Sequence, residues 1–213
     1  MADNYLEKRY EEVFGSSSSR PASVAGKPSL ETLLRHNRSY RGYDRSYVVH
    51  PRQLEAMVRV NTLVASSVNM QSLRFHLVCG GEEASKVNSL IKMGRALPEL
   101  NLPFPGTEPE AFIVVCGTVA ENASVCIDLG ISLQSMLLKA VELGLGGLIV
   151  RNFDHAALKE ALALPLEPLA VVAVGKPAEK IELVPVRAGS DLRYYRRDGI
   201  HFVPKIVPDD LLV

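Results

Sequence analysis

The sequence has few cysteines, and their spacing forms no structural framework. Its 213 residues include only Cys79, Cys116 and Cys126, with no C-x-x-C pair. An odd number of widely spaced thiols excludes a complete set of disulfides and is typical of reduced cysteines in the cytoplasm. The first residues, MADNYLEKRYEEVF, are charged and lack the apolar region of a secretory signal. We therefore expect a cytoplasmic protein.

The chain also lacks net charge and a long uninterrupted apolar run. Lysine plus arginine and aspartate plus glutamate number 24 each, so the overall field attracts neither nucleic acid nor an anionic membrane. The best candidate for a membrane span is interrupted by Asp128, Lys139 and Glu142. We expect neither nucleic acid nor a membrane as a partner, and any anion must be bound by a local group of cations.

Several enzyme signatures are missing. The sequence contains no G-x-S-x-G, no P-loop and no G-x-G-x-x-G after a strand, which removes the usual signs of nucleophilic catalysis and of Rossmann-type dinucleotide binding. The glycines of ELGLGG, residues 142–147, follow an expected helix and are most simply its end. No metal site is expected, because the five histidines have no ligand spacing: His36, His50, His76, His155 and His201.

What is present predicts one folded domain after an N-terminal arm. Hydrophobic residues make up 47% of the chain and charged residues 23%, enough for one sizeable core. We expect a helical arm and a flexible joint over residues 1–29, and the folded domain over 30–213. Apolar periodicity predicts helices from Pro51, over 86–97 and over 124–147, a loop over 98–110, and strands over 72–81, 111–117 and 168–175.

The long helix predicted over 124–147 carries an amide among apolar residues. Gln134 falls on the side formed by Ile127, Ile131, Leu138 and Val141, opposite a polar stripe. We expect that side to be buried, and an unpaired buried amide costs about 1–3 kcal/mol. The partner of Gln134 could be the backbone, a second subunit or a ligand. The polar stripe consists of Asp128, Ser132, Ser135, Lys139 and Glu142.

Three clusters could carry chemistry, and each has a plain structural alternative. Arg38, Ser39 and Arg41, with Arg45 nearby, could wrap a phosphate or could form a solvated charge run. The polar turn ASSVNMQ, residues 65–71, could read the edge of a heterocycle or could cap a helix. The segment YYRRDGIHFVPK, residues 194–205, is aromatic and basic, or is a charged tail packed on the surface.

Taken in order, the clusters resemble the nitroreductase family of FMN-dependent flavoproteins. The matching motifs are NRSYR, ASSVNMQSLRF, DLGISLQ followed by GLG, and VPK, and they run from about Leu30 to the end of the chain. The resemblance implies an α+β fold with a mixed central sheet flanked by helices. It also implies a homodimer that binds FMN at the subunit interface.

The resemblance assigns roles to seven residues. Arg38, Ser39, Arg41 and Lys205 match the residues that hold the phosphate and ribityl chain of FMN in the family. Ser66, Asn69 and Gln71 match the turn that contacts the isoalloxazine ring, and Gln134 matches a glutamine of the central helix. Arg38 is also the candidate cation for the N1–C2 edge of the reduced flavin. No residue of the chain is assigned a catalytic role, because the flavin carries the chemical step.

The implied activity is the reduction of a small electron-poor acceptor, such as a nitroaromatic compound or a quinone, with NAD(P)H as the hydride donor. Four positions depart from the family pattern: Asn37, Ala65, Leu73 and Arg151. Arg151 stands where relatives often have a glycine that lies close to flavin N5. One alternative is another reaction on the same fold, because relatives also carry out flavin destruction or reductive dehalogenation. The other is an FMN-binding or structural protein without turnover, which Asn37 and Arg151 motivate.

Overall fold

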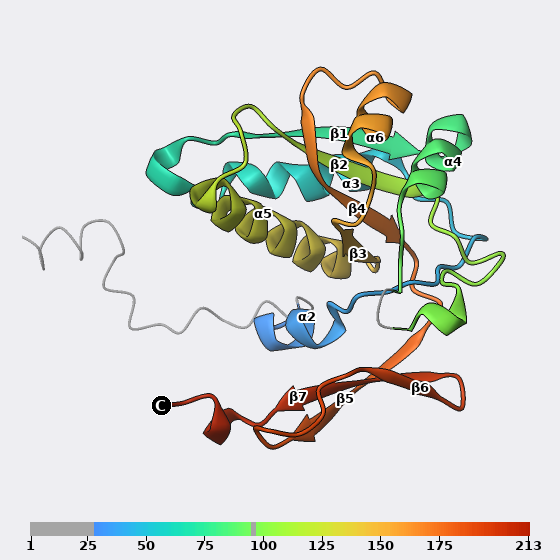
Figure 1. Cartoon of the computed structure of the whole chain (residues 1–213), viewed down its shortest axis with the longest axis vertical. Helices are drawn as coiled ribbons and strands as arrows, with labels where there is room; N and C mark the ends of the chain where they lie inside the picture. The colour runs from blue at the N-terminus through green and yellow to red at the C-terminus, as the bar shows by residue number, and fades with distance from the viewer. Residues whose placement is uncertain (1–27, 95–96) are drawn as a thin grey trace, which may run out of the picture.

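The fold contains two β-sheets and five described α-helices (Figure 1). The computed structural model describes residues 28–94 and 97–213, so the predicted N-terminal helix and most of the joint lie outside the described residues. The helices are α2 (Leu30–His36), α3 (Pro51–Arg59), α4 (Gly81–Leu90), α5 (Ala123–Glu142) and α6 (His155–Ala161). The strands are β1 (Leu73–Cys79), β2 (Ala111–Gly117), β3 (Gly146–Val150), β4 (Glu167–Gly175), β5 (Lys180–Val186), β6 (Tyr195–Arg197) and β7 (Ile200–Ile206).

The central sheet has the strand order β1-β2-β4-β3, and all three strand pairs are antiparallel. Strands β2 and β4 lie in the middle and are buried along almost their whole length, as their continuous apolar sequences AFIVVCG and PLAVVAVG predict. The predicted mixed character of this sheet is reduced to an isolated parallel bridge between Ser39 and Gly147. That bridge attaches residues 37–43, which we call the cationic segment, to the edge strand β3.

Helices cover both faces of the central sheet. Helices α3 and α5 pack on one face, where Leu54, Met57 and Met136 are fully buried. Helices α4 and α6 pack on the other face, against Phe112 and Val114. Helix α4 starts five residues earlier than predicted, at a pair of glycines with positive φ, and Glu82 and Glu83 follow in its first turn, where the helix dipole favours acids.

The buried face of α5 is not the predicted one. Gln134 is exposed, and Ile127 is 61% exposed, whereas Asp128 and Ser132 are buried. Burial of this side within the chain was a wrong expectation, because Asp128 finds donors inside the fold, so a polar residue points inward and apolar residues are left outside; burial against a second subunit stays a prediction. The inward residues are Val125, Asp128, Leu129, Ser132, Leu133, Met136, Leu137 and Ala140. By length and composition alone α5 could cross a membrane, but these contacts with the sheet are those of a core helix.

The glycines after α5 do more than end the helix. Gly144 ends it with φ +73°, as expected, but Gly146 and Gly147 already belong to β3. A Cβ atom at Gly146 would lie 2.4 Å from Cδ2 of Tyr40 and 2.8 Å from Cγ of Pro177. The absence of a side chain therefore lets the cationic segment lie directly on the sheet.

Replacing this glycine tests the close approach. We expect Gly146→Ala to lower the free energy of unfolding by about 1–3 kcal/mol, because the new methyl group overlaps the buried Tyr40 ring. Denaturant unfolding of the two single variants and the double variant with Tyr40→Ala completes a thermodynamic cycle. The double variant should lose less free energy of unfolding than the sum of the two single losses, by about 0.5–3 kcal/mol. Additive losses would show that the cost arises elsewhere.

The C-terminal sheet has the order β5-β7-β6, with β5 parallel to β7 and β6 antiparallel to it. Asp198 and Gly199, both with positive φ, form the turn between β6 and β7. The alternative of a charged tail over residues 194–205 was wrong, because this segment forms β6 and β7 of the sheet. The Asp-Gly pair between the two short strands is a hairpin signal. The sheet lies across the cationic segment, on its side away from the central sheet (Figure 1).

Candidate functional site

The cationic segment, residues 37–43, is fixed between the two sheets. The Tyr40 amide donates to the Gly147 carbonyl at 3.2 Å, and the Tyr43 hydroxyl donates to the Tyr40 carbonyl at 2.8 Å. Both tyrosines are buried against the glycines of β3 and β4. Their fixed positions leave Arg38 and Arg41 facing the C-terminal sheet. Arg45 leaves the group and pairs with Glu110 and, at 3.3 Å, with Glu108.

Four of the seven predicted cofactor residues lie around one cavity of about 250 Å³, which we call the cationic pocket. Arg38, Ser39 and Arg41 come from the cationic segment, and Lys205 comes from β7. Lys205 is more than 160 positions from the other three in the sequence, so only the fold brings it to them. The remaining lining residues are Asn37, Ile181, Tyr194, His201 and Val203.

Each arginine of the pocket donates one hydrogen bond to a backbone carbonyl and keeps other N–H donors without a partner. Arg41 is 9% exposed, donates to the Ser39 carbonyl at 3.0 Å, and stacks its guanidinium 4.9 Å above the Tyr194 ring. Arg38 donates to the Leu34 carbonyl at 2.6 Å, and burial lowers its pKa. The Nε atoms of both side chains are buried without a partner. A phosphoryl group, with several strong acceptor oxygens, fits this donor set.

One carboxylate supports the back of the cationic pocket. Glu179 accepts from the backbone amide of Arg41 and forms an ion pair with Arg196 of β6. Its side chain is 8% exposed, so it acts as a buried brace between the two sheets. The charges of Arg38, Arg41 and Lys205 that face the cavity are left for an external anion.

The other three predicted residues lie in the loop of residues 66–71. Val68, Asn69 and Gln71 have positive φ values of 45°, 56° and 48°. Non-glycine residues in this region cost about 1–3 kcal/mol each and persist only where their surroundings enforce them. Asp128 of α5 supplies that constraint, because its Oδ1 accepts from the Ser67 amide at 2.8 Å and from the Ser67 hydroxyl at 2.9 Å.

The loop lies beside a second pocket of about 290 Å³, which Ser66 and Gln71 line. It shares no residue with the cationic pocket. Helix α5 carries both regions, since Asp128 bonds the loop and Gln134 accepts from Asn37 Nδ2 at 3.2 Å. Six residues of helix place these two contacts roughly 9 Å apart along the axis and about 120° apart around it. One chain therefore presents the predicted residues as two separate groups.

Sequence reasoning missed three residues of the cationic pocket and its support: Tyr194, His201 and Glu179. The first two lie in the segment 194–205 that drew attention by composition, but no individual role followed from it. Period-two alternation along β7 could have found His201, since it shares a face with Val203 and Lys205. Glu179 gave no signal, because an acid just before a strand is common.

Two departures from the family pattern have partners here. Asn37 bonds Gln134, so it joins the cationic segment to α5 instead of adding a charge. Arg151 donates to both oxygens of Glu121 at 2.7 and 2.8 Å, and this pairing raises the pKa of the guanidinium. Within the part of the chain that the structure describes, no group of three or more histidine, cysteine or acidic residues could hold a metal ion.

Comparison with known proteins identifies the family. The Nitroreductase family pattern matches residues 34–176, and no curated protein matches the chain. The fold is similar to a nitroreductase family protein from Streptococcus pneumoniae TIGR4, with 15% identity, a TM-score of 0.59 and coverage of 72% of this chain and 93% of that one. A variant of the FMN and NADPH-dependent nitroreductase NfnB from sphigopyxis sp. strain HMH is 17% identical, with a TM-score of 0.60 and coverage of 71% of this chain and 89% of that one.

An FMN-dependent nitroreductase from Clostridium difficile R20291 is 20% identical, with a TM-score of 0.56 and coverage of 70% and 87%. At such identities the solved structures establish the fold alone. The family pattern spans the cationic segment, the 66–71 loop, α5 and the glycines of β3. The chain therefore belongs to the nitroreductase family.

Proposed function

We propose that the protein is an FMN-dependent oxidoreductase that transfers a hydride from NAD(P)H to a small electron-poor acceptor, such as a nitroaromatic compound or a quinone. The observation that carries this proposal is the cationic pocket, where Arg38, Ser39, Arg41 and Lys205 surround one cavity. FMN is favoured because a single phosphate matches one such pocket. The descriptions of all three solved structures compared above name nitroreductases, and two of these three name FMN.

The residues present fit the cofactor. The buried Nε atoms of Arg38 and Arg41 need acceptors, and a phosphoryl group supplies them. Bound FMN would supply the two-electron chemistry itself. The chain's own contribution is to bind the phosphate, to orient the ring with Ser66, Asn69 and Gln71, and to exclude water from the site. Arg38 remains our candidate for stabilising negative charge on the reduced ring.

We further propose that the active form is a homodimer. The outward face of α5 carries Ile127, Ile131, Leu138 and Val141, and Leu63 and Val68 of the neighbouring region are 85% and 92% exposed. An apolar surface of this kind favours a partner over water. A second copy covering it would bring the 66–71 loop of one subunit toward the cationic pocket of the other, so that two separate groups complete one flavin site.

Cofactor identity tests the proposal directly. We expect the purified protein to carry FMN, or to acquire it on reconstitution, and denaturation followed by chromatography identifies the released flavin. Anaerobic addition of NADH and of NADPH in separate samples should bleach the flavin absorbance, and the faster of the two is the donor. Recovery of FAD, or of no flavin after incubation with excess FMN, would contradict the assignment.

The alternative without turnover is motivated by Arg151 and Asn37, two departures from the family pattern. Arg151 is paired with Glu121 directly after β3, and Asn37 bonds Gln134. Bound FMN that no nicotinamide bleaches would support that alternative. Bleaching without reduction of nitroaromatics or quinones would favour another reaction on the same fold. The cytoplasmic location and the lack of nucleic-acid and membrane partners stay predictions.

A further inference from the structure

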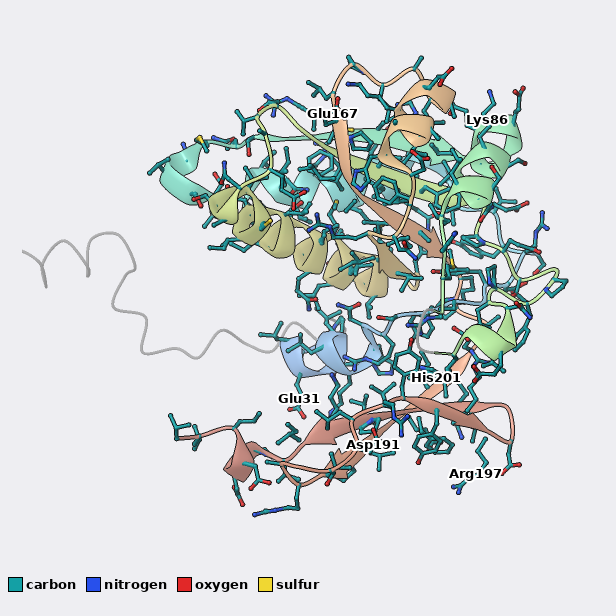
Figure 2. The ribbon with its side chains drawn as sticks, viewed as in Figure 1. Glu31, Lys86, Glu167, Asp191, Arg197 and His201 are labelled. Atoms are coloured by element: carbon teal, nitrogen blue, oxygen red, sulfur yellow. The ribbon has the colours of Figure 1, made fainter. Side chains whose placement is uncertain are left out.

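His201 is a buried imidazole that the roles described above leave unexplained. It lies on β7 of the C-terminal sheet (Figure 2), it lines the cationic pocket, and it is 2% exposed. Its Nδ1 atom is buried without a hydrogen-bond partner. A buried polar atom of this kind costs free energy unless something pairs with it. Because the ring borders the cavity, a ligand in the pocket is within its direct surroundings.

The groups around His201 are mainly cationic. Arg196 of β6 and Ile181 of β5 are its neighbours across the two strand pairs. Arg41 approaches from the cationic segment, Tyr194 packs its ring 5.0 Å from the imidazole, and Lys205 follows four residues later on the same face of β7. Arg38 lines the same cavity, and Glu179, the acid in this group, is engaged by Arg196 and by the Arg41 amide.

We propose that His201 is a proton-coupled sensor of the FMN phosphate: neutral in the free protein, it takes up a proton when the phosphoryl dianion enters the cationic pocket. This inference rests on the proposed function and adds a residue and a pH dependence to it. The physical reason is local charge. Without an anion, the neighbouring cations oppose one more positive charge on His201, and a dianion in the pocket stabilises that charge.

The direction of the pH dependence follows. Burial, and then the charges of Arg41 and Arg196, lower the pKa of His201 to about 4. Binding of the dianion raises this pKa, so protonation of His201 favours the complex and affinity for FMN falls as pH rises through the pKa of the bound state. The second pKa of the phosphate is about 6, so above about pH 7 the phosphate is already a dianion. Proton uptake at pH 7.5 then reports the protein.

The test is calorimetric titration of the full-length apoprotein with FMN at pH 7.5, in two buffers of different ionisation enthalpy. The difference in heat gives the protons exchanged on binding. We expect net proton uptake on binding, of at most about one proton per FMN. Riboflavin, which has the same ring and no phosphate, should bind without this uptake. His201→Gln should abolish the uptake, whereas His36→Gln, an exposed histidine on α2, should preserve it.

A measurement on the unaltered protein covers the case that His201→Gln fails to fold. Carbon NMR of the histidine rings from pH 5 to 8 should show one imidazole that is neutral without ligand and protonated with FMN at neutral pH. Inorganic phosphate in excess should shift the same signal. FMN binding without proton uptake, or with uptake that persists in His201→Gln, overturns the role of His201 and leaves the proposed function intact. No FMN binding at all overturns both.

Discussion

Arg41→Ala is expected to lower the affinity of the apoprotein for FMN by about ten- to a hundredfold, which corresponds to the loss of a charge-assisted phosphate contact of about 1.5–3 kcal/mol. Arg41 is the most buried cation of the cationic pocket, and its orientation is fixed by the Ser39 carbonyl and the Tyr194 ring. Bleaching by nicotinamide, measured per bound flavin, should change little, because Arg41 serves binding.

Arg45→Ala provides the matched control, since Arg45 belongs to the same stretch of sequence but pairs with Glu108 and Glu110 outside the pocket. Its affinity for FMN should stay within about twofold of the parent protein, because exposed ion pairs contribute little. Fluorescence quenching of FMN measures both variants, and denaturant unfolding checks that each folds. Equal affinities for all three proteins would show that Arg41 has a structural role and does not bind the phosphate.

If the protein is the homodimer proposed above, Ile127→Glu is expected to dissociate it and to release FMN at the same time. In the single chain this side chain is 61% exposed, so a charge there costs the isolated subunit little. In a dimer that covers the outward face of α5 the same charge would be buried without a partner, which costs several kcal/mol. Size exclusion with light scattering should give twice the mass of one chain for the parent protein and a smaller average mass for the variant.

Ser85→Glu is the control for the added charge, because Ser85 is exposed on α4, on the opposite face of the central sheet. It should leave both the mass and the bound FMN unchanged. Leu138→Glu, on the same face of α5 as Ile127, should repeat the effect of Ile127→Glu. A stable monomer that keeps its flavin would refute the shared site, although membership of the nitroreductase family would stand.

Short-range patterns predicted the elements that depend on burial on both sides. Strands β2 and β4 are apolar on both faces, so the sequence pattern predicts burial of both faces and a place in the middle of the sheet. The hairpin of β6 and β7 was not predicted, although Asp198 and Gly199 between two short strands are a local hairpin signal. The cationic group was found because arginines and a serine lie within a few residues of one another.

Patterns with two possible faces were not decidable in this way. Helix α5 has apolar residues around most of its circumference, and the inward face was chosen by Asp128, which satisfies the Ser67 amide and hydroxyl 61 positions away. Likewise, nothing local showed that Gly146 would admit Tyr40 or that Glu179 would brace Arg41 and Arg196. These outcomes depend on which polar groups find partners across long separations.

By itself, the sequence indicated the family, three of the four strands of the central sheet and the long helix, because each is encoded by neighbouring side chains with characteristic spacing. The family resemblance added the seven candidate cofactor residues, and the strand β3 was not predicted. Only the tertiary structure decided that Arg38, Ser39, Arg41 and Lys205 share a cavity while Ser66, Asn69 and Gln71 lie apart from it. It also placed His201 among arginines. Such placements arise because burial and hydrogen-bond satisfaction are properties of the whole packed chain, and residues far apart in sequence meet only when both are achieved together.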